Sequence, residues 1–388
     1  MTKLDDRYSQ FETTSLTHAR TESDPYNYVP RRGLSIPSIT VLDSEGCVIE
    51  EEQRRVFRHN AQQGMGADII FGAGTTGEWN RISNRQRQRL IRMEADEIAR
   101  INLDLVASGR QSVEGWVGVT APTRAEVLSN LECAIDAGAD AAVIAPLSIA
   151  DIGEIVPFFQ REVSDLFDHR GTWIPVFLYD NADIAIDPRL SHIRTRDVKR
   201  LSRLQFISGI KVSASRRVLG NYTKGALHYK DKGGFGVYVG DAMLMFQVFK
   251  LEDGPIGRVR EYWNRYLLHN ELPVGVVSGP ANALPREWQR AWRACYAGDE
   301  RLMPICKSAF DRFDEACHFT EMGKSVRKTI ACLKYALRLE GIITSDLVAK
   351  GTQALTEDEQ AAFEKRYQKI RDYLASSIDP LWLSKSEA

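Results

Sequence analysis

The segment Phe206-Ile-Ser-Gly-Ile-Lys-Val-Ser-Ala214 predicts a strand that is buried on both faces of a parallel sheet. It is largely a continuous run of apolar residues, without the polar alternation of a strand that has one face in water. Its only charged side chain, Lys211, lies near the carboxyl end of the run. The segment therefore indicates an α/β protein and singles out one lysine.

Seven more runs of this kind occur along the chain, and stretches with helical periodicity separate them. Clear helical stretches are 50–64, 84–100, 124–138 and 152–168. The repeated alternation predicts an α/β fold, a closed (β/α)8 TIM barrel, and an open doubly wound sheet is the alternative. The eight predicted strands are Leu34–Leu42, Ala67–Phe71, Leu103–Ala107, Ala141–Ala145, Ile174–Tyr179, Phe206–Val212, Phe235–Val239 and Gly275–Ser278.

Three regions follow from this pattern. Residues 1–32 are polar and lack periodicity, which predicts an N-terminal arm outside the barrel of residues 33–298. Residues 299–388 form the predicted C-terminal helical region. About 35 residues separate the seventh and eighth strand runs, including Glu252–Pro255 and Tyr262–Leu268, and they predict a long crossover or an insertion. Helical patterns towards the C-terminus cover Pro285–Tyr296, Arg301–His318, Ser325–Leu339 and Glu357–Ser376.

Composition limits the classes of partner. The chain has 388 residues, 43% of them hydrophobic, and a formal net charge of −1 from 51 basic and 52 acidic residues. That balance argues against nucleic acid and anionic membranes as partners. No apolar run is long enough to span a bilayer, and residues 1–28 lack the apolar core of a signal peptide. With six scattered cysteines and no CxxC pair, the chain is expected to be cytoplasmic with free thiols.

The active site of such a barrel lies at the carboxyl ends of its strands, where Lys211 and Tyr179 are expected on neighbouring strands. Burial disfavours the charged ammonium, and a neutral amine can attack a ketone to form an imine. A phenol beside it can move the protons that imine chemistry requires. The alternatives are a lysine that points to solvent or pairs with a carboxylate, and a tyrosine that only caps the barrel core.

The segment Gly72-Ala-Gly-Thr-Thr-Gly-Glu78 follows the second predicted strand. Its glycines allow close approach of a ligand, and two hydroxyls with nearby N–H groups could hold a carboxylate. The segment also matches the GxGxxG dinucleotide pattern. However, that pattern belongs after a first strand and opens a helix directly, which does not happen here.

Further candidates follow the last two predicted strands. Asp241 comes after the seventh strand, and Ser278 and Asn282 come at the end of the eighth. They could line the rim of a pocket, although we favour Asp241 as the N-cap of a helix over residues 242–250. The seven histidines show no metal-like spacing, which argues against a metal-dependent aldolase.

Taken together, these residues resemble the dihydrodipicolinate synthase / N-acetylneuraminate lyase family of class I pyruvate-dependent aldolases. The resemblance covers roughly Gly33 to Asp346, including a helical piece around Lys334–Ile342, and the ordered set is more specific than any single motif. The matching pieces are Gly74-Thr-Thr-Gly-Glu78, Phe177-Leu-Tyr-Asp-Asn181, Gly209-Ile-Lys211, Val239-Gly-Asp241 and Gly275–Asn282.

The resemblance implies roles for the matched residues. Lys211 would form a Schiff base with a 2-oxo acid, Tyr179 would relay protons, and Thr75 would connect to that relay. Substrate binding would involve Thr76, which with its neighbours holds the carboxylate, and the further candidates Gly74, Gly77, Ser148, Asp241 and Ser278. Family members are often homotetramers, so a homo-oligomer is expected, a dimer or a tetramer. No metal and no organic cofactor are expected.

Two departures argue against a typical dihydrodipicolinate synthase. Those enzymes carry a tyrosine pair after the fourth strand, one of which reaches a neighbouring subunit's site, where this chain has Ala145-Pro-Leu-Ser148. They also carry an arginine shortly after the tyrosine of the fifth strand, and Tyr179-Asp-Asn-Ala-Asp-Ile-Ala185 has none. An acidic, amide-bearing loop suits a hydroxylated or otherwise neutral aldehyde better.

Three hypotheses follow for the function. The first is a Schiff-base lyase or aldolase that breaks or forms a carbon–carbon bond between pyruvate, or a similar 2-oxo acid, and an aldehyde. The second is a dehydratase of a 2-oxo-3-deoxy sugar acid that uses the same imine. The third is a catalytically inactive barrel that binds a 2-oxo acid.

Overall fold

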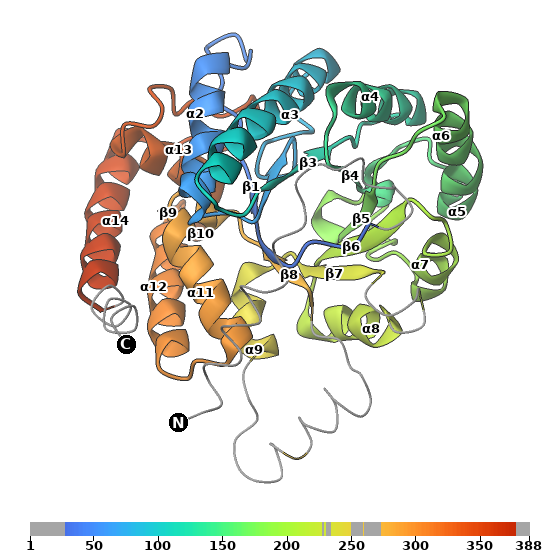
Figure 1. Ribbon diagram of the computed structural model, residues 1–388. Helices are drawn as coiled ribbons and strands as arrows, with labels where there is room; N and C mark the ends of the chain where they lie inside the picture. The colour runs from blue at the N-terminus through green and yellow to red at the C-terminus, as the bar shows by residue number, and fades with distance from the viewer. Residues whose placement is uncertain (1–27, 227–228, 230–233, 250–258, 260–272, 378–388) are drawn as a thin grey trace.

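The computed structural model describes residues 28–226, 229, 234–249, 259 and 273–377. Its centre is a closed barrel of eight parallel strands that pair in chain order, with β8 against β1 (Figure 1). The barrel confirms the predicted TIM fold and excludes the open sheet. The strands are β1 Gly33–Pro37, β2 Ile69–Gly72, β3 Glu114–Gly118, β4 Ala141–Ile144, β5 Val176–Asn181, β6 Ile207–Ser213, β7 Gly236–Val239 and β8 Gly275–Val277.

The predicted third strand was wrong. Leu103–Ala107 forms the last turns of helix α3 (Asn84–Ala107), and β3 begins at Glu114. Within those turns Leu103 is 72% exposed while Leu105 is 3% exposed, which is the one-sided burial of a helix. The true strand reads Glu-Gly-Trp-Val-Gly, and with two glycines it lacks the β-branched run that marks the other strands.

Helices between the strands cover the outside of the barrel (Figure 1). Several begin and end at the residues expected from capping: the Thr123 hydroxyl accepts the Glu126 N–H at the start of α4, and Gly138 closes that helix in the left-handed conformation. The helices are α2 Glu50–Ala61, α3, α4 Arg124–Ala137, α5 Ile155–Pro157, α6 Ser164–Arg170, α7 Thr195–Leu201, α8 Arg216–Ala226 and α9 Met245–Val248. Short turns of 3₁₀ or π-helix are Gln62–Gly64, Pro146–Ser148, Phe158–Val163, Ala182–Ile184, Ala242–Leu244 and Pro280–Asn282.

Aromatic rings fill the barrel below its carboxyl end. Trp116 stacks on Phe177 with ring centroids 4.0 Å apart, and Tyr238 meets Trp116 edge-on at 4.9 Å. Gly209 makes room for them, because a Cβ on it would lie 2.8 Å from the Phe177 ring and 2.4 Å from the Gly236 carbonyl oxygen. The barrel is therefore a packed core, and space for a ligand lies at its mouths.

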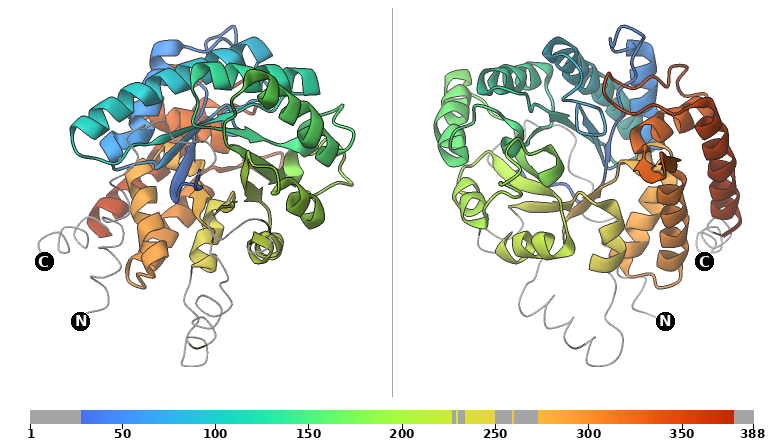
Figure 2. Two further views of the ribbon diagram at one scale, coloured as in Figure 1. Left: turned by 45° about the vertical axis from the view of Figure 1, so that its right-hand side comes forward. Right: turned by 180° about the vertical axis from the view of Figure 1, so that it is seen from behind.

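The C-terminal region packs beside the barrel, next to α2 (Figures 1 and 2). It contains α12 Leu302–Ala316, α13 Thr329–Leu339 and α14 Glu357–Ser377, and it follows α11 Pro285–Ala297, which lies within the predicted barrel region. The expected helix over 325–339 was wrong at its start, because Lys324–Arg327 forms β10, which pairs antiparallel with β9 (His318–Glu321). Met322 and Gly323 make the tight turn between these strands, both with positive φ.

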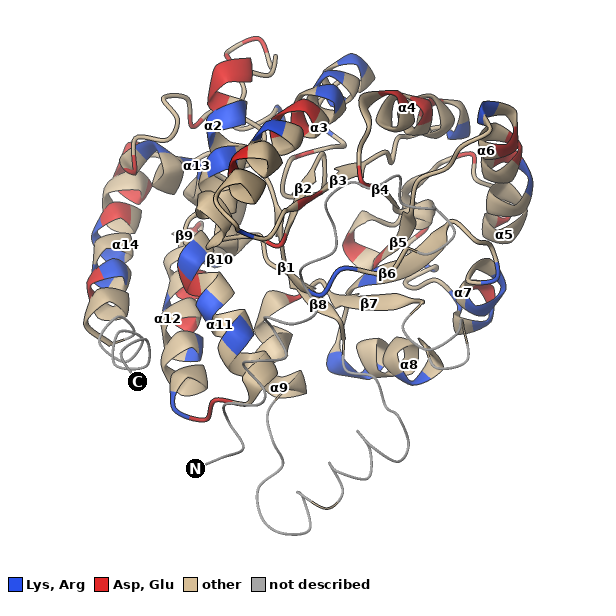
Figure 3. Ribbon diagram, in the orientation of Figure 1, with Lys and Arg blue, Asp and Glu red and all other residues tan. Residues whose placement is uncertain are grey.

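The predicted arm lies mostly outside the described residues, and so do the segments 252–255 and 262–268. Of the arm, Tyr28 reaches the amino-terminal end of the barrel, where its hydroxyl donates to Glu114 at 2.9 Å. Acidic and basic side chains are interspersed along outer helices such as α11, α12 and α14 (Figure 3). Within the described part of the chain, no helix combines the length and hydropathy of a membrane-spanning segment.

Candidate active site

Lys211 and Tyr179 lie side by side on β6 and β5, where they are paired in the sheet register. The Lys211 Nζ lies 3.9 Å from the centroid of the Tyr179 ring and 5.1 Å from that of Phe71. The two side chains are 5% and 6% exposed. Among the described residues, no acidic side chain forms an ion pair with Lys211. The structure thus places the amine against aromatic rings, contrary to the alternative of a solvent-facing or carboxylate-paired lysine.

The phenol oxygen of Tyr179 has three side-chain partners. Asn181 Nδ2 donates to it at 2.9 Å, Ser213 Oγ lies at 3.3 Å and Thr75 Oγ1 at 3.5 Å. Burial alone raises the pKa of Tyr179, but the charge of Lys211 and these three hydrogen bonds more than offset burial and leave the pKa below its ordinary value. The phenol oxygen therefore has polar partners in addition to the hydrophobic packing of its ring.

Thr75 and Thr76 stand in the loop that follows β2, as expected. The loop lies close to the end of β1, because a Cβ on Gly77 would be 2.9 Å from the Ser38 carbonyl oxygen. Gly74 is similarly constrained, since a Cβ there would touch the Phe71 ring at 2.9 Å. Thr76 is half-buried, and its hydroxyl faces the loop after β8 at Gly279. Both glycines shape the loop that carries the two threonines to the barrel mouth.

An ion pair whose two side chains are both buried connects this loop to the C-terminal region. Glu78, at the end of the loop, accepts from Lys334 of α13 at 2.6 Å, and both side chains are 0% exposed. Glu78 also accepts from the Ala349 N–H and the Thr352 hydroxyl, and Lys334 also donates to the Leu347 carbonyl. Each buried polar atom of this ion pair therefore has a hydrogen-bonding partner. Both residues lie within the motifs quoted from the sequence, but their contact was not foreseen.

The remaining predicted residues occupy the same end of the barrel in different ways. Ser148 donates to the Ile184 carbonyl at 2.8 Å, so its hydroxyl links two loops. Asp241 accepts the Met243 N–H at 3.2 Å, which confirms the favoured N-cap interpretation. Ser278 is fully buried after β8, and its hydroxyl has no partner among the described residues. Asn282 donates to the carbonyl of Pro37 at the end of β1 and accepts the N–H of Ile39 just after it, which is a structural role.

Two contacts to the phenol were missed from the sequence. Asn181 and Ser213 are the last residues of β5 and β6 and are paired in register, one alternation beyond Tyr179 and Lys211. The signal was available in principle, because residues two apart on a strand share a face. By contrast, Asp180 points to the outer side, where it accepts from the Ile193 N–H, His192 and Tyr222. Its carboxylate therefore does not belong to the site.

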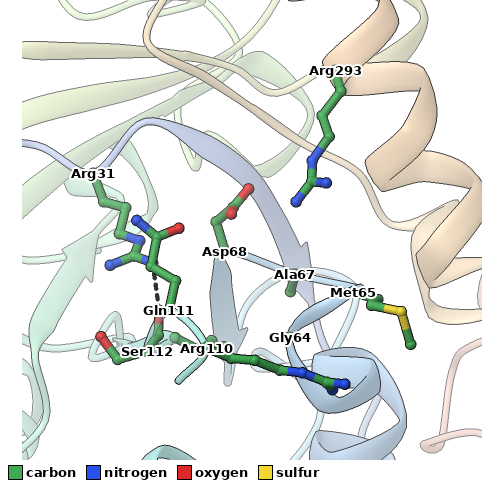
Figure 4. A pocket seen from close by; sticks show the side chains of 10 residues that line it. Arg31, Gly64, Met65, Ala67, Asp68, Arg110, Gln111, Ser112 and Arg293 are labelled. Carbon is green, nitrogen blue, oxygen red and sulfur yellow. Dashed lines mark hydrogen bonds between the residues drawn. The ribbon is translucent and has the colours of Figure 1, made fainter. Parts of the chain in front are cut away.

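A cavity of about 320 Å³ opens at the other end of the barrel, before β2 and β3. Arg31, Arg110 and Arg293 surround it together with Asp68 (Figure 4). None of the predicted site residues lines it, so it is separate from the lysine site. Within the described residues, no three His, Cys, Asp or Glu side chains gather as a metal site would require.

Comparison with known proteins agrees with this geometry. Residues 30–259 match the model of the Dihydrodipicolinate synthetase family. The chain belongs to this family. No curated protein matches the chain.

Solved structures share the fold at low sequence identity. Dihydrodipicolinate synthase from Bacteroides thetaiotaomicron is 23% identical, with a TM-score of 0.67 over 88% of this chain and 100% of that one. The 4-hydroxy-tetrahydrodipicolinate synthase from Methylacidiphilum fumariolicum SolV is 17% identical, with a TM-score of 0.65 over 90% and 98%. A prophage protein of this family from E. coli K12, solved in complex with pyruvate, is 17% identical, with a TM-score of 0.64 over 88% and 98%. This distance is consistent with a family member that is not a typical dihydrodipicolinate synthase.

Proposed function

We propose that this protein is a Schiff-base lyase or aldolase that breaks or forms a carbon–carbon bond between pyruvate, or a similar 2-oxo acid, and an aldehyde. The observation that carries the proposal is the buried Lys211 amine against the Tyr179 ring, with no acidic partner among the described residues. Membership of a family of class I aldolases and lyases supports it.

In this proposal Lys211 condenses with the ketone of the 2-oxo acid. Nitrogen forms a bond to the carbonyl carbon, and the carbonyl oxygen leaves as water with two protons that started on the ammonium. The resulting iminium is an electron sink, so the carbon–carbon bond to the hydroxyl-bearing carbon can break when Tyr179 takes the proton of that hydroxyl, which gives an enamine and an aldehyde. Return of this proton to the enamine carbon gives the iminium of pyruvate, and water then hydrolyses it to pyruvate and the lysine ammonium. No metal or organic cofactor enters any of these steps.

Tyr179 is the proposed proton carrier, and Thr75 is its link to the loop after β2. Thr76 and the backbone around Gly74 and Gly77 are the proposed carboxylate site, because hydroxyl and N–H donors suit a carboxylate. Asp180 of β5 is occupied on the outer side, and Asp187 in the following loop pairs with Arg189. Asp183 is therefore the carboxylate after β5 that is left for the aldehyde. A neutral, hydroxylated aldehyde remains the better fit, because the segment of residues 180–185 that directly follows Tyr179 contains no arginine.

The test is chemical trapping. The protein is incubated with pyruvate and reduced with borohydride, and we expect a stable mass increase on the peptide that contains Lys211. The matched control is Lys211→Arg, which keeps a charge but cannot form the imine under these conditions. Reduction that leaves the wild-type peptide unmodified would end the proposal.

Release of pyruvate from a panel of 2-oxo acids then identifies the reaction. Pyruvate release from a 2-oxo-3-deoxy sugar acid means lyase, whereas loss of water without pyruvate means dehydratase. If pyruvate is trapped but no member of the panel is turned over, the result would favour a catalytically inactive barrel that binds a 2-oxo acid. The homo-oligomer inferred from the family is a separate prediction, which light scattering on the purified chain would measure.

A further inference from the structure

Two of the three hydrogen bonds to the Tyr179 oxygen come from strands β5 and β6. Strands β5 and β6 are neighbours in the barrel (Figure 1). In their ladder, Tyr179 pairs with Lys211, and Asn181 pairs with Ser213 at the next inward-facing position. Asn181 and Ser213 therefore form a rim directly above the amine and the phenol. Thr75 approaches the same oxygen from the loop after β2. The phenol oxygen thus meets three side chains of one chain.

The Asn181 amide has a fixed orientation. Its Oδ1 accepts the Asp183 N–H at 3.0 Å, which starts the turn Ala182–Ile184. Nδ2 is consequently directed to the Tyr179 oxygen at 2.9 Å, and an amide nitrogen can only donate. Asn181 is 7% exposed, so water does not readily replace this bond. A bond that can only be donated to the phenol oxygen becomes stronger when that oxygen carries negative charge.

The position of the Ser213 hydroxyl is also constrained, by the backbone of the neighbouring strand end. A Cβ on Gly240 would lie 2.3 Å from the Ser213 Oγ, so the glycine after β7 leaves room for the hydroxyl and packs beside it. The loop after β4 supplies nothing equivalent, because the Ser148 hydroxyl is engaged with the Ile184 carbonyl. The described contacts of the phenol thus come from β5, β6 and the loop after β2.

We propose that Asn181 and Ser213 are positioning residues that complete the proton relay within a single chain by stabilising the phenolate of Tyr179. This inference rests on the proposed function and extends it to two residues. In the relay the phenolate takes a proton from the attacking nitrogen of Lys211 and delivers it to the carbinolamine oxygen. That oxygen leaves as water with a second proton that follows the same route. The phenolate is regenerated, and the protons balance.

The experiment uses Asn181→Asp, Asn181→Leu and Ser213→Ala in the full chain. Asn181→Asp keeps the oxygen that accepts the Asp183 N–H and replaces only the donor with a negative charge. Asn181→Leu removes both functions at similar volume. The matched control is Ser208→Ala, since Ser208 is a buried serine of the same strand whose hydroxyl faces the Phe206 carbonyl and not the phenol. Circular dichroism and melting curves identify variants that fail to fold.

The first readout does not depend on turnover. Ionisation of Tyr179 is followed by tyrosinate absorbance as the difference between each protein and the same protein with Tyr179→Phe. We expect the midpoint to move to higher pH, by about one unit for Asn181→Asp and less for Ser213→Ala. The control should match wild type. An unchanged midpoint in all three variants would overturn the inference, whatever the enzyme's substrate.

The second readout is the rate of pyruvate trapping against pH. For a relay that needs the phenolate, this rate rises with pH until Tyr179 is ionised. Near neutral pH the Asn181→Asp rate should therefore be about tenfold lower and should recover at higher pH. A merely structural role would lower the rate equally at every pH, and that result would overturn the inference. If wild type itself traps nothing, the proposed function fails, while the absorbance titration still decides the roles of Asn181 and Ser213.

Discussion

At the scale of single residues, the chemistry depends on what surrounds one amine and one phenol. Lys211 lies among aromatic rings, and the oxygen of Tyr179 collects hydrogen bonds from three side chains. Other tyrosines differ in this respect. Burial and the nearby Asp180 raise the pKa of Tyr222, and burial raises the pKa of Tyr229 to about 12. Tyr179 should therefore ionise before them.

Removing the phenol oxygen tests its role in proton transfer. We expect Tyr179→Phe to lower turnover by about 10²–10⁴-fold, the usual contribution of a positioned acid–base group. Lys211 should still be trapped by pyruvate, only more slowly. Tyr373→Phe, on α14 and far from β5 in sequence, is the control and should behave like wild type. Steady-state rates with the best substrate of the panel measure the effect, and undiminished turnover in Tyr179→Phe would refute the relay.

His59 provides a pH-dependent stability. Burial lowers its pKa to about 4, although its ring donates to the Asn282 carbonyl at 3.0 Å. Because the folded pKa lies below the unfolded one, stability is present above about pH 6.5 and is lost as pH falls towards 4. Between pH 7.5 and pH 5 the loss should be about 2 kcal/mol. Denaturant unfolding of wild type and His59→Gln at pH 7.5 and pH 5 measures it.

The control for that experiment is the exposed His169→Gln, which should retain the wild-type pH dependence. Contributions from other groups cancel in the difference between wild type and His59→Gln. Equal slopes against pH in those two proteins would show that His59 carries no such linkage.

At the scale of elements, the register of β5 and β6 is what builds the site. Pairing of Tyr179 with Lys211 and of Asn181 with Ser213 puts four side chains on one inner face. A slip of β5 by one residue would turn Tyr179 and Asn181 outward and Asp180 inward, away from and into the face that carries Lys211. The ladder is fixed below the site by the fit of the Phe177 ring against Gly209.

Filling that space should destabilise the barrel. In Gly209→Ala the new Cβ would meet the Gly236 carbonyl oxygen and the Phe177 ring, so we expect a loss of about 1–3 kcal/mol in unfolding free energy. Gly220→Ala is the matched variant. Gly220 lies within α8 with no atom near the new Cβ, so stability should rise by about 0.5–1 kcal/mol. Urea unfolding distinguishes these opposite signs, and two equal shifts would contradict the packing argument.

At the scale of the whole molecule, the C-terminal region supports the active-site loop. Burial lowers the pKa of Lys334, against the attraction of Glu78, which raises it. The pair joins residues 256 positions apart and holds the end of the loop that carries Thr75 and Thr76. The helices beside the barrel thus help to hold the loop of the proposed substrate site.

Removing one partner of the buried Lys334–Glu78 pair should lower the free energy of unfolding far more than removing one partner of a surface pair. Lys334→Met leaves the Glu78 carboxylate buried without its cation, so we expect a loss of about 3–5 kcal/mol. Lys307→Met removes a pair with Asp311 in which both side chains are 46% exposed, and it should change stability by less than about 0.5 kcal/mol. Thermal or urea unfolding of both variants gives the comparison. Similar losses in the two would mean that burial is not the cause.

The sequence by itself determined the barrel, the neighbouring positions of Lys211 and Tyr179, and the loop with Thr75 and Thr76. Each follows from local periodicity and from the rule that the carboxyl ends of parallel strands meet at one end of a barrel. The sequence misplaced the third strand because Leu103–Ala107 looks more strand-like than the glycine-containing segment that replaces it. Only the tertiary structure decided the contacts of Asn181 and Ser213 with the phenol and of Lys334 with Glu78. These contacts depend on strand register and on packing between segments far apart in the chain, which local patterns do not encode.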